Sequence, residues 1–152
     1  MSLRRAVLSD LEIIKQIVEL TISEIYPHYY PKGAVEFFLR HHNEANIVRD
    51  IEQDRVFLCQ DAGGAVVGTI TVAENEISRL FVLPVYQGNG YGTEMLDYAE
   101  KMIAGRASEV ILDASLPAKK MYLDRGYEAV SYHVITTDDH DFLCYDVMRK
   151  QV

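Results

Sequence analysis

The chain has 152 residues, of which 49% are apolar, and it carries a formal net charge of −8 at pH 7. This length and composition can bury the core of one domain, so we expect residues 1–152 to form a single domain. The acidic charge argues against a nucleic-acid partner, because phosphate binding requires a basic face.

The sequence also argues against a membrane, a disulfide and a metal. It contains no apolar run of membrane-spanning length and no secretion signal, so we expect no membrane span and a cytoplasmic location. Cys59 and Cys144 lie in apolar, strand-like runs and should behave as small buried hydrophobes. The histidines lack the spacing of metal ligands, so we expect no metal site: His28, His41, His42, His133 and His140.

The N-terminal third predicts a strand followed by helices. Residues 3–7 can form the strand, and Ser9-Asp10-Leu11-Glu12 has the pattern of a capping box that begins a helix. Apolar residues then recur at three- and four-residue spacing until Pro27 ends the helix. Two short helices follow, with Asn43 as a break or cap between them: residues 34–42 and 44–53.

The rest of the chain predicts six strands and two helices. Asp61-Ala62-Gly63-Gly64 is a hairpin signal between the first two strands, and Gly105 is a C-cap signal. The predicted strands are residues 55–60, 65–73, 76–83, 110–115, 127–135 and 142–149, and the predicted helices are 90–104 and 117–125. With the two short helices counted as one region, the order β-α-α-β-β-β-α-β-α-β-β predicts an α+β fold with a mixed sheet.

The segment 80–93, L-F-V-L-P-V-Y-Q-G-N-G-Y-G-T, is an apolar strand that leads into a glycine loop and a helix. Gly88, Gly90 and Gly92 permit a tight turn and let the backbone approach an anion without an intervening Cβ. The free N–H groups and the dipole of the helix N-terminus favour a phosphate there. Such glycines also occur in plain connections. Nucleotide binding of the Walker or G-x-G-x-x-G type is disfavoured, because neither pattern is present.

Two motifs together resemble those of the GCN5-related N-acetyltransferases (GNAT). Residues 87–92, Q-G-N-G-Y-G, fit the family's Q/R-x-x-G-x-G/A signature. A later strand and helix are similar to its second motif, N-x-x-A-x-x-x-Y-x-x-x-G-F/Y, with Ala118, Tyr122, Gly126 and Tyr127 in register. Ser115 stands where many members carry Asn. The element order is also that of the family, so the resemblance spans essentially the whole chain.

The resemblance implies a three-layer α/β/α fold whose mixed, mostly antiparallel sheet has splayed fourth and fifth strands. It implies direct acetyl transfer from acetyl-CoA to a primary amine of a small molecule or peptide, and the acidic charge mildly favours a cationic acceptor. We expect Lys119, Lys120 or Arg125 to help hold the anionic coenzyme. The expected coenzyme-binding residues are Leu80, Phe81, Val82, Gln87, Gly88, Asn89, Gly90, Tyr91, Gly92, Thr93, Ser115, Ala118 and Tyr122.

The same resemblance suggests catalytic residues. Tyr122 matches the tyrosine that protonates the departing thiolate in many members, although a tyrosine on a helix can also be simple packing. Glu76 is the candidate base that removes a proton from the amine, with Glu74 as its competitor; a surface carboxylate without a role is the alternative.

The resemblance also implies that the acceptor wall includes the aromatic loop with Tyr26, His28, Tyr29 and Tyr30, and that the last strand pair can add Tyr132 or His133. The loop could equally be a lid over the core. A noncatalytic acyl-CoA-binding module is the alternative function. Exposed strand edges near the C-terminus could pair in a homodimer.

Overall fold

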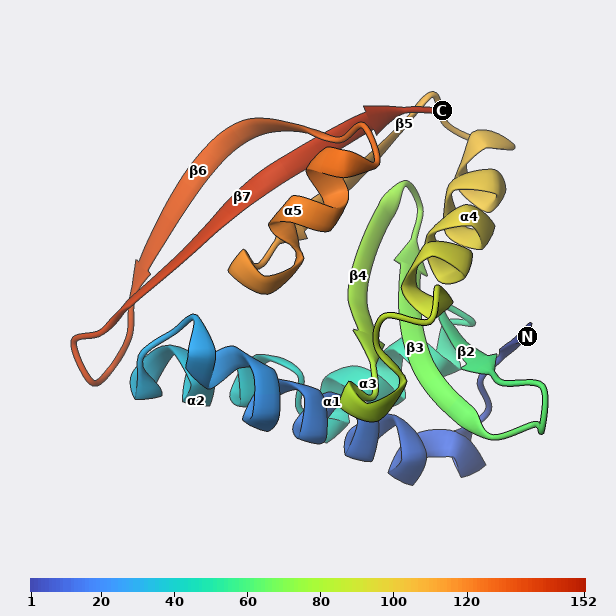
Figure 1. Cartoon of the computed structure of the whole chain (residues 1–152), viewed down its shortest axis with the longest axis horizontal. Coiled ribbons are helices and arrows are strands. Elements are labelled where there is room, and N and C mark those ends of the chain that lie inside the picture. Colours follow the sequence, from blue (N-terminus) through green and yellow to red (C-terminus); the bar gives the residue numbers. More distant parts are fainter.

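The computed structural model describes the whole chain, Met1–Val152, and its elements follow the predicted order (Figure 1). The strands are β1 (Ser2–Arg5), β2 (Val56–Gln60), β3 (Val66–Ala73), β4 (Glu76–Val82), β5 (Glu109–Ala114), β6 (Glu128–Thr136) and β7 (Phe142–Gln151). The helices are α1 (Leu11–Ile25), α2 (Lys32–His41), α3 (Glu44–Glu52), α4 (Tyr91–Ala104) and α5 (Leu116–Asp124). None of the helices combines the length and apolarity that crossing a membrane requires.

Of the two predicted helix N-terminal caps, the one of α3 is confirmed and the one of α1 is wrong. Asn43 caps α3, because its side chain accepts a hydrogen bond from the N–H of Asn46 at 3.0 Å. Ser9 does not cap α1. The carboxylate of Asp10 instead accepts from the N–H of Val7 at 2.8 Å and pairs with the Arg4 guanidinium at 2.7 Å. A charged acceptor beside a guanidinium makes a stronger hydrogen bond than a hydroxyl.

The seven strands form one sheet in the order β1-β2-β3-β4-β5-β7-β6. Neighbouring strands are antiparallel except β4 and β5, which are parallel. These two pair only at Glu76 with Ile111 and at Ile77 with Leu112. Beyond that point the strands diverge, as Figure 1 shows for β4, which turns away from β5 and β7. The predicted mixed sheet with a splayed fourth and fifth strand is therefore confirmed.

Helices cover both faces of the sheet and define two cores. On one face, residues of α4 and α5 pack against the sheet, with Met95 and Leu96 fully buried. On the other face, α1, α2 and α3 bury Ile14, Ile22 and Ile47. The separate cores confirm the three-layer arrangement, and they leave the diverging β4–β5 edge between them.

Strand β6 is the outer edge of the sheet and is exposed along almost its whole length. Val130, Tyr132 and Val134 are among the large apolar side chains that face solvent there. The predicted homodimer would form through this exposed edge, and it stays a prediction.

Candidate active site

A cavity of about 940 Å³ opens where β4 and β5 diverge. Its wall comes from α1, α2, β4, the glycine loop, the β5–α5 junction and β7. Sixteen of the predicted site residues line it: Tyr26, His28, Tyr29, Glu76, Leu80, Phe81, Val82, Gln87, Gly88, Gly90, Tyr91, Gly92, Thr93, Ser115, Ala118 and Tyr122. Asn89 and Tyr30 do not, and Tyr132 and His133 also lie outside the lining.

The glycine loop ends at the cavity as the start of α4. Gly88 and Gly90 have φ values of 77° and 87°, in the left-handed region that favours glycine. The first hydrogen bond within α4 runs from the N–H of Glu94 to the carbonyl of Gly90 at 3.0 Å. The preceding N–H groups in this first turn therefore remain available to an anion.

Gly92 leaves open space in the same turn. A Cβ built there would meet nothing closer than the Met121 sulfur at 3.8 Å and Val82 Cγ2 at 4.0 Å. Protein packing thus does not require a glycine at this position. The open space on the cavity side can be filled by a ligand that lies against the backbone.

Side chains of the loop hold it in shape. Gln87 donates to the carbonyl of Val82 at 3.0 Å, and Asn89 donates to the carbonyls of Tyr86 and Gln87 at 3.0 and 3.2 Å. Asn89 therefore supports the loop from within, which explains why its side chain is absent from the cavity wall.

The edge of β4 that faces the cavity has no neighbouring strand. The N–H of Leu83 donates to Val67 in β3 at 2.9 Å, so the backbone groups of the adjacent Val82 point to the opposite, open edge. The Val82 carbonyl accepts there from Gln87 and from the Thr21 hydroxyl at 3.3 Å. Its N–H is left directed at the gap.

A bulge in β4 re-aims the strand beside the gap. Arg79 has a φ of 48°, in the left-handed region, and the register of β3 and β4 shifts at this point. Its buried guanidinium pairs with Asp50 at 2.9 Å and donates to the Thr71 hydroxyl at 3.1 Å. The ion pair links the bulge to α3, and it compensates the positive charge of Arg79, which lines the cavity.

His42 lines the cavity beside this bulge, and its Nδ1 atom is buried without a hydrogen-bond partner. Burial, and secondarily the charge of Arg79, lowers the pKa of His42 to about 3. The imidazole is therefore neutral at physiological pH, and it packs edge-on against Phe81 at 5.5 Å between ring centroids.

Tyr122 reaches the cavity from α5. Its side chain is 5% exposed, and its hydroxyl makes no hydrogen bond within the protein. Burial, and secondarily Tyr26, raises the pKa of the phenol above its ordinary value. The ring packs against Tyr127 with centroids 5.4 Å apart. The structure thus presents a protonated, rigid hydroxyl to the cavity.

Two carboxylates face the cavity without an ion pair. Glu76 lies in β4 and Asp113 in β5, and neither makes an ion pair or a side-chain hydrogen bond. Loss of solvent, and secondarily the charge of Asp113, raises the pKa of Glu76. Loss of solvent also raises the pKa of Asp113, an effect opposed by His133 and His41. Asp113 was missed in the sequence, although it lies two residues before Ser115 and so on the same face of the strand.

The aromatic loop contributes two tyrosines to the wall and uses the third to hold the fold. Tyr26 is buried and donates to the Ser115 hydroxyl at 3.3 Å, whereas Tyr29 is 52% exposed. The Tyr30 hydroxyl accepts from the N–H of Leu116 at 2.8 Å and donates to the carbonyl of Cys144 at 3.1 Å. Tyr30 therefore holds the start of α5 in place, and it does not line the cavity in which the amine substrate was expected.

The cations expected near the glycine loop are directed elsewhere. Lys119 pairs with Asp146 at 2.7 Å, and Lys120 pairs with Asp124 at 2.5 Å. Arg125 is bound by acidic residues of α4, and none of the three cations lines the cavity. That expectation was wrong, because each side chain finds a carboxylate within the fold that the sequence does not reveal.

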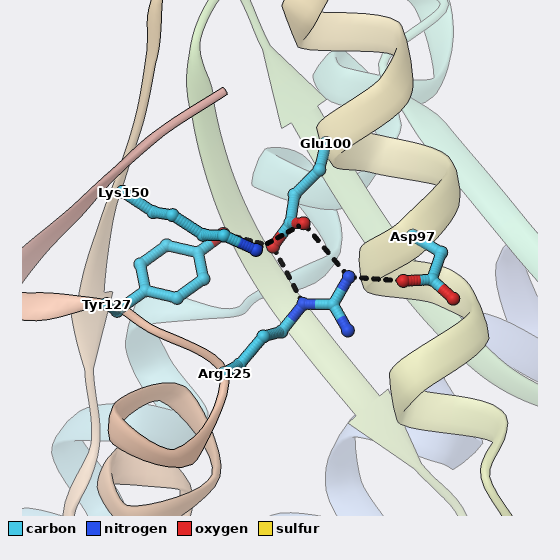
Figure 2. Close-up of polar contacts among 5 residues, drawn as sticks. All are labelled: Asp97, Glu100, Arg125, Tyr127 and Lys150. Carbon is cyan, nitrogen blue, oxygen red and sulfur yellow. Dashed lines mark hydrogen bonds and ion pairs between the residues drawn. The ribbon is translucent and has the colours of Figure 1, made fainter.

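Arg125 belongs to a polar cluster around Glu100 (Figure 2). The Glu100 carboxylate pairs with Arg125 at 2.7 Å and Lys150 at 2.9 Å, and it accepts from the Tyr127 hydroxyl at 2.9 Å. Asp97 also contacts Arg125. Although burial alone would raise it, these hydrogen bonds lower the pKa of Glu100. The cluster joins α4 and β7 to the end of α5, the helix that carries Tyr122.

Comparisons with known proteins agree with this geometry. A family model described as an acetyltransferase (GNAT) domain matches residues 25–140. A search of curated proteins finds no match. Similar solved structures include a GCN5-related N-acetyltransferase of Rhodopseudomonas palustris, with a TM-score of 0.89, 23% identity and coverage of 99% of this chain and 95% of that one.

Two further similar structures contain the coenzyme. The PaiA N-acetyltransferase of Thermoplasma acidophilum in complex with coenzyme A has a TM-score of 0.72 and 19% identity, covering 99% of this chain and 98% of that one. The acetyltransferase YncA of Salmonella typhimurium with acetyl-CoA has a TM-score of 0.72 and 14% identity, covering 99% and 93%.

The splayed sheet, the glycine loop and the matched family model together define an acetyltransferase. The chain belongs to the GNAT acetyltransferase family.

Proposed function

We propose that the protein transfers an acetyl group from acetyl-CoA directly to a primary amine of a small molecule or peptide. One observation carries this proposal: a single cavity holds the open edge of β4, the first turn of α4 and the Tyr122 hydroxyl. The coenzyme A and acetyl-CoA complexes of structurally similar proteins support it.

The backbone at the glycine loop would hold the coenzyme. No cation lines this part of the cavity, so the pyrophosphate would depend on the N–H groups of residues 88–93 and on the positive end of α4. The open space at Gly92 fits a ligand that lies against the main chain. The unpaired edge of β4 can bind the amide groups of the pantetheine arm as a neighbouring strand would.

Acetyl-CoA would supply an activated thioester, whose C–S bond breaks as the C–N bond to the amine forms. The Val82 N–H would stabilise the negative charge that develops on the carbonyl oxygen. Tyr122 would give its proton to the departing thiolate, since burial keeps the phenol protonated. The phenolate regains a proton from solvent, so the products are an acetylated amine, free coenzyme A and one released proton.

Glu76 is our proposed base. An alkylamine with a pKa of about 10.4 pays about 4.6 kcal/mol to become neutral at pH 7, so it needs a proton acceptor. The raised pKa of Glu76 makes it a better acceptor than an ordinary carboxylate. It can act directly or through a water molecule.

Replacement of Tyr122 by Phe tests the proposal. We expect turnover to fall by about tenfold or more, because the thiolate would leave without a proton donor. Affinity for coenzyme A, measured by calorimetry, should change little. The assay is acetyl-CoA consumption over a panel of polyamines, amino acids, aminoglycosides and peptide N-termini. If Tyr122→Phe turned over as fast as the wild type, Tyr122 would have no part in the reaction.

A further inference from the structure

The cavity carries a net negative charge on the protein side. Its wall contains three formally charged side chains, Glu76, Arg79 and Asp113. Arg79 is neutralised by Asp50, at 2.9 Å. The two remaining carboxylates have lost part of their solvent and form no ion pair or side-chain hydrogen bond, although His133 and His41 act to lower the pKa of Asp113.

Strand geometry places both carboxylates on one face of the sheet. Val110, Leu112 and Ala114 of β5 are buried in the core that α4 and α5 cover, so Asp113 faces the opposite side, toward α2. Glu76 pairs in register with Ile111, which shares the face of Asp113. The carboxylates therefore lie near the point at which the strands diverge, and they repel one another.

Aromatic side chains line the same cavity. Phe37 and His41 of α2 stack with ring centroids 6.1 Å apart and planes within 8°, and Tyr145 of β7 stacks on His133 at 5.1 Å and 14°. Phe37, His41 and Tyr145 line the cavity. Aromatic faces together with carboxylates attract alkylammonium groups.

Tyr122 provides a separate indication that a polar ligand belongs in this cavity. The residue is 5% exposed and lines the same wall, and its hydroxyl forms no hydrogen bond within the protein. The hydroxyl is therefore free to bind a polar ligand.

On the basis of the proposed acetylation of amines, we propose that the acceptor carries two cationic groups and that Asp113 determines this preference. Glu76 receives the proton of the reacting amine, and Asp113 binds the second ammonium group. Linear diamines and amino sugars share this chemistry. Zwitterions such as free amino acids are disfavoured, because their carboxylate would meet the same two anions.

The test compares amines of equal carbon number, such as n-butylamine and 1,4-diaminobutane, in the acetyl-CoA consumption assay. We expect the wild type to prefer the diamine in kcat/KM by about tenfold or more, and Asp113→Asn to lose most of that preference. Asp113→Glu should retain it with shorter diamines. Linear polyamines and aminoglycosides, assayed in parallel, distinguish the two sources of the dication.

Glu109→Gln is the matched control, because it removes the same charge from the same strand outside the cavity. It should keep the diamine preference. Calorimetry of 1,4-diaminobutane on the protein saturated with coenzyme A gives a readout that does not require turnover.

The possible failures are distinct. If no amine is acetylated, the proposed function fails. If monoamines and diamines are acetylated equally well, if Asp113→Asn keeps the preference, or if the diamine releases no heat that depends on Asp113, the inference about Asp113 is overturned.

Discussion

Two sets of carboxylates in the molecule have opposite surroundings: Glu100 is buried and fully paired, whereas Glu76 and Asp113 face the cavity and are more exposed. Around Glu100, every oxygen has a partner, drawn from Arg125, Tyr127 and Lys150, and the pKa of the carboxyl is lowered (Figure 2). In the cavity, Glu76 and Asp113 have none, and the pKa of each is raised. The paired cluster holds helices in place, whereas the unpaired carboxylates are the ones to which we assign the binding of a cationic ligand.

The largest effect should come from breaking the satisfied cluster. We expect Glu100→Gln to lower the free energy of unfolding by about 3 kcal/mol, because it leaves Arg125 and Lys150 without their buried anion. Urea unfolding followed by circular dichroism measures this loss. Asp97→Asn is the control: its side chain is 66% exposed, so we expect a loss of less than about 1 kcal/mol. Equal losses for the two variants would contradict the importance of burial.

A substitution at Gly92 tests whether the cavity binds the coenzyme against the first turn of α4. We expect Gly92→Ala to weaken coenzyme A binding by about tenfold, or about 1.4 kcal/mol, because the new methyl group occupies the space beside the backbone. Stability should rise by about 0.5 to 1 kcal/mol, since alanine favours the helix. Calorimetry and thermal unfolding measure the two effects.

Gly105→Ala, at the other end of α4 and outside the cavity, is its control for coenzyme binding. Its affinity for coenzyme A should match that of the wild type. Unchanged affinity in Gly92→Ala would mean that the coenzyme does not lie against this turn.

The smallest change in stability should come from the unpaired carboxylates of the cavity, Glu76 and Asp113. We expect Glu76→Gln to raise stability at pH 7 by less than about 1 kcal/mol while it lowers activity, because it removes a charge that has lost solvent and, secondarily, is repelled by Asp113. The folded state raises the pKa of Glu76, so this carboxyl costs stability only above its ordinary pKa of 4.5.

The pH dependence of the two glutamates should therefore have opposite signs. The gain from Glu76→Gln should vanish as the pH falls below 4.5. The pKa of Glu100 is lowered by folding, so its contribution to stability is present at neutral pH and is lost on acidification. Unfolding curves at pH 7 and pH 4 compare the two, and a loss of stability in Glu76→Gln at pH 7 would contradict the proposed repulsion.

The fold could be predicted from the sequence because its signals are local. Helical and strand periodicity, Asn43 as a cap, and the glycines at 88 and 90 depend on neighbours along the chain. The spacing of the second motif also predicted Tyr122 and Ser115 as site residues, and both line the cavity. Even Asp113 was within reach, since it shares the strand face of Ser115.

Other features depend on contacts between distant segments and were not predictable. The positive φ of Arg79 is stabilised by Asp50, which lies on another element. Lys119 was expected to bind the coenzyme, but it pairs with Asp146, which lies on β7. No pattern in the sequence states which of the many acidic residues will meet which cation.

The Tyr30 hydroxyl joins three segments of the chain. It connects the aromatic loop to the first N–H of α5 and to the carbonyl of Cys144 in β7. Any movement of the aromatic loop that broke these two hydrogen bonds would release the first turn of α5, the helix that carries Tyr122. The position of the loop and the position of the Tyr122 hydroxyl therefore depend on one another.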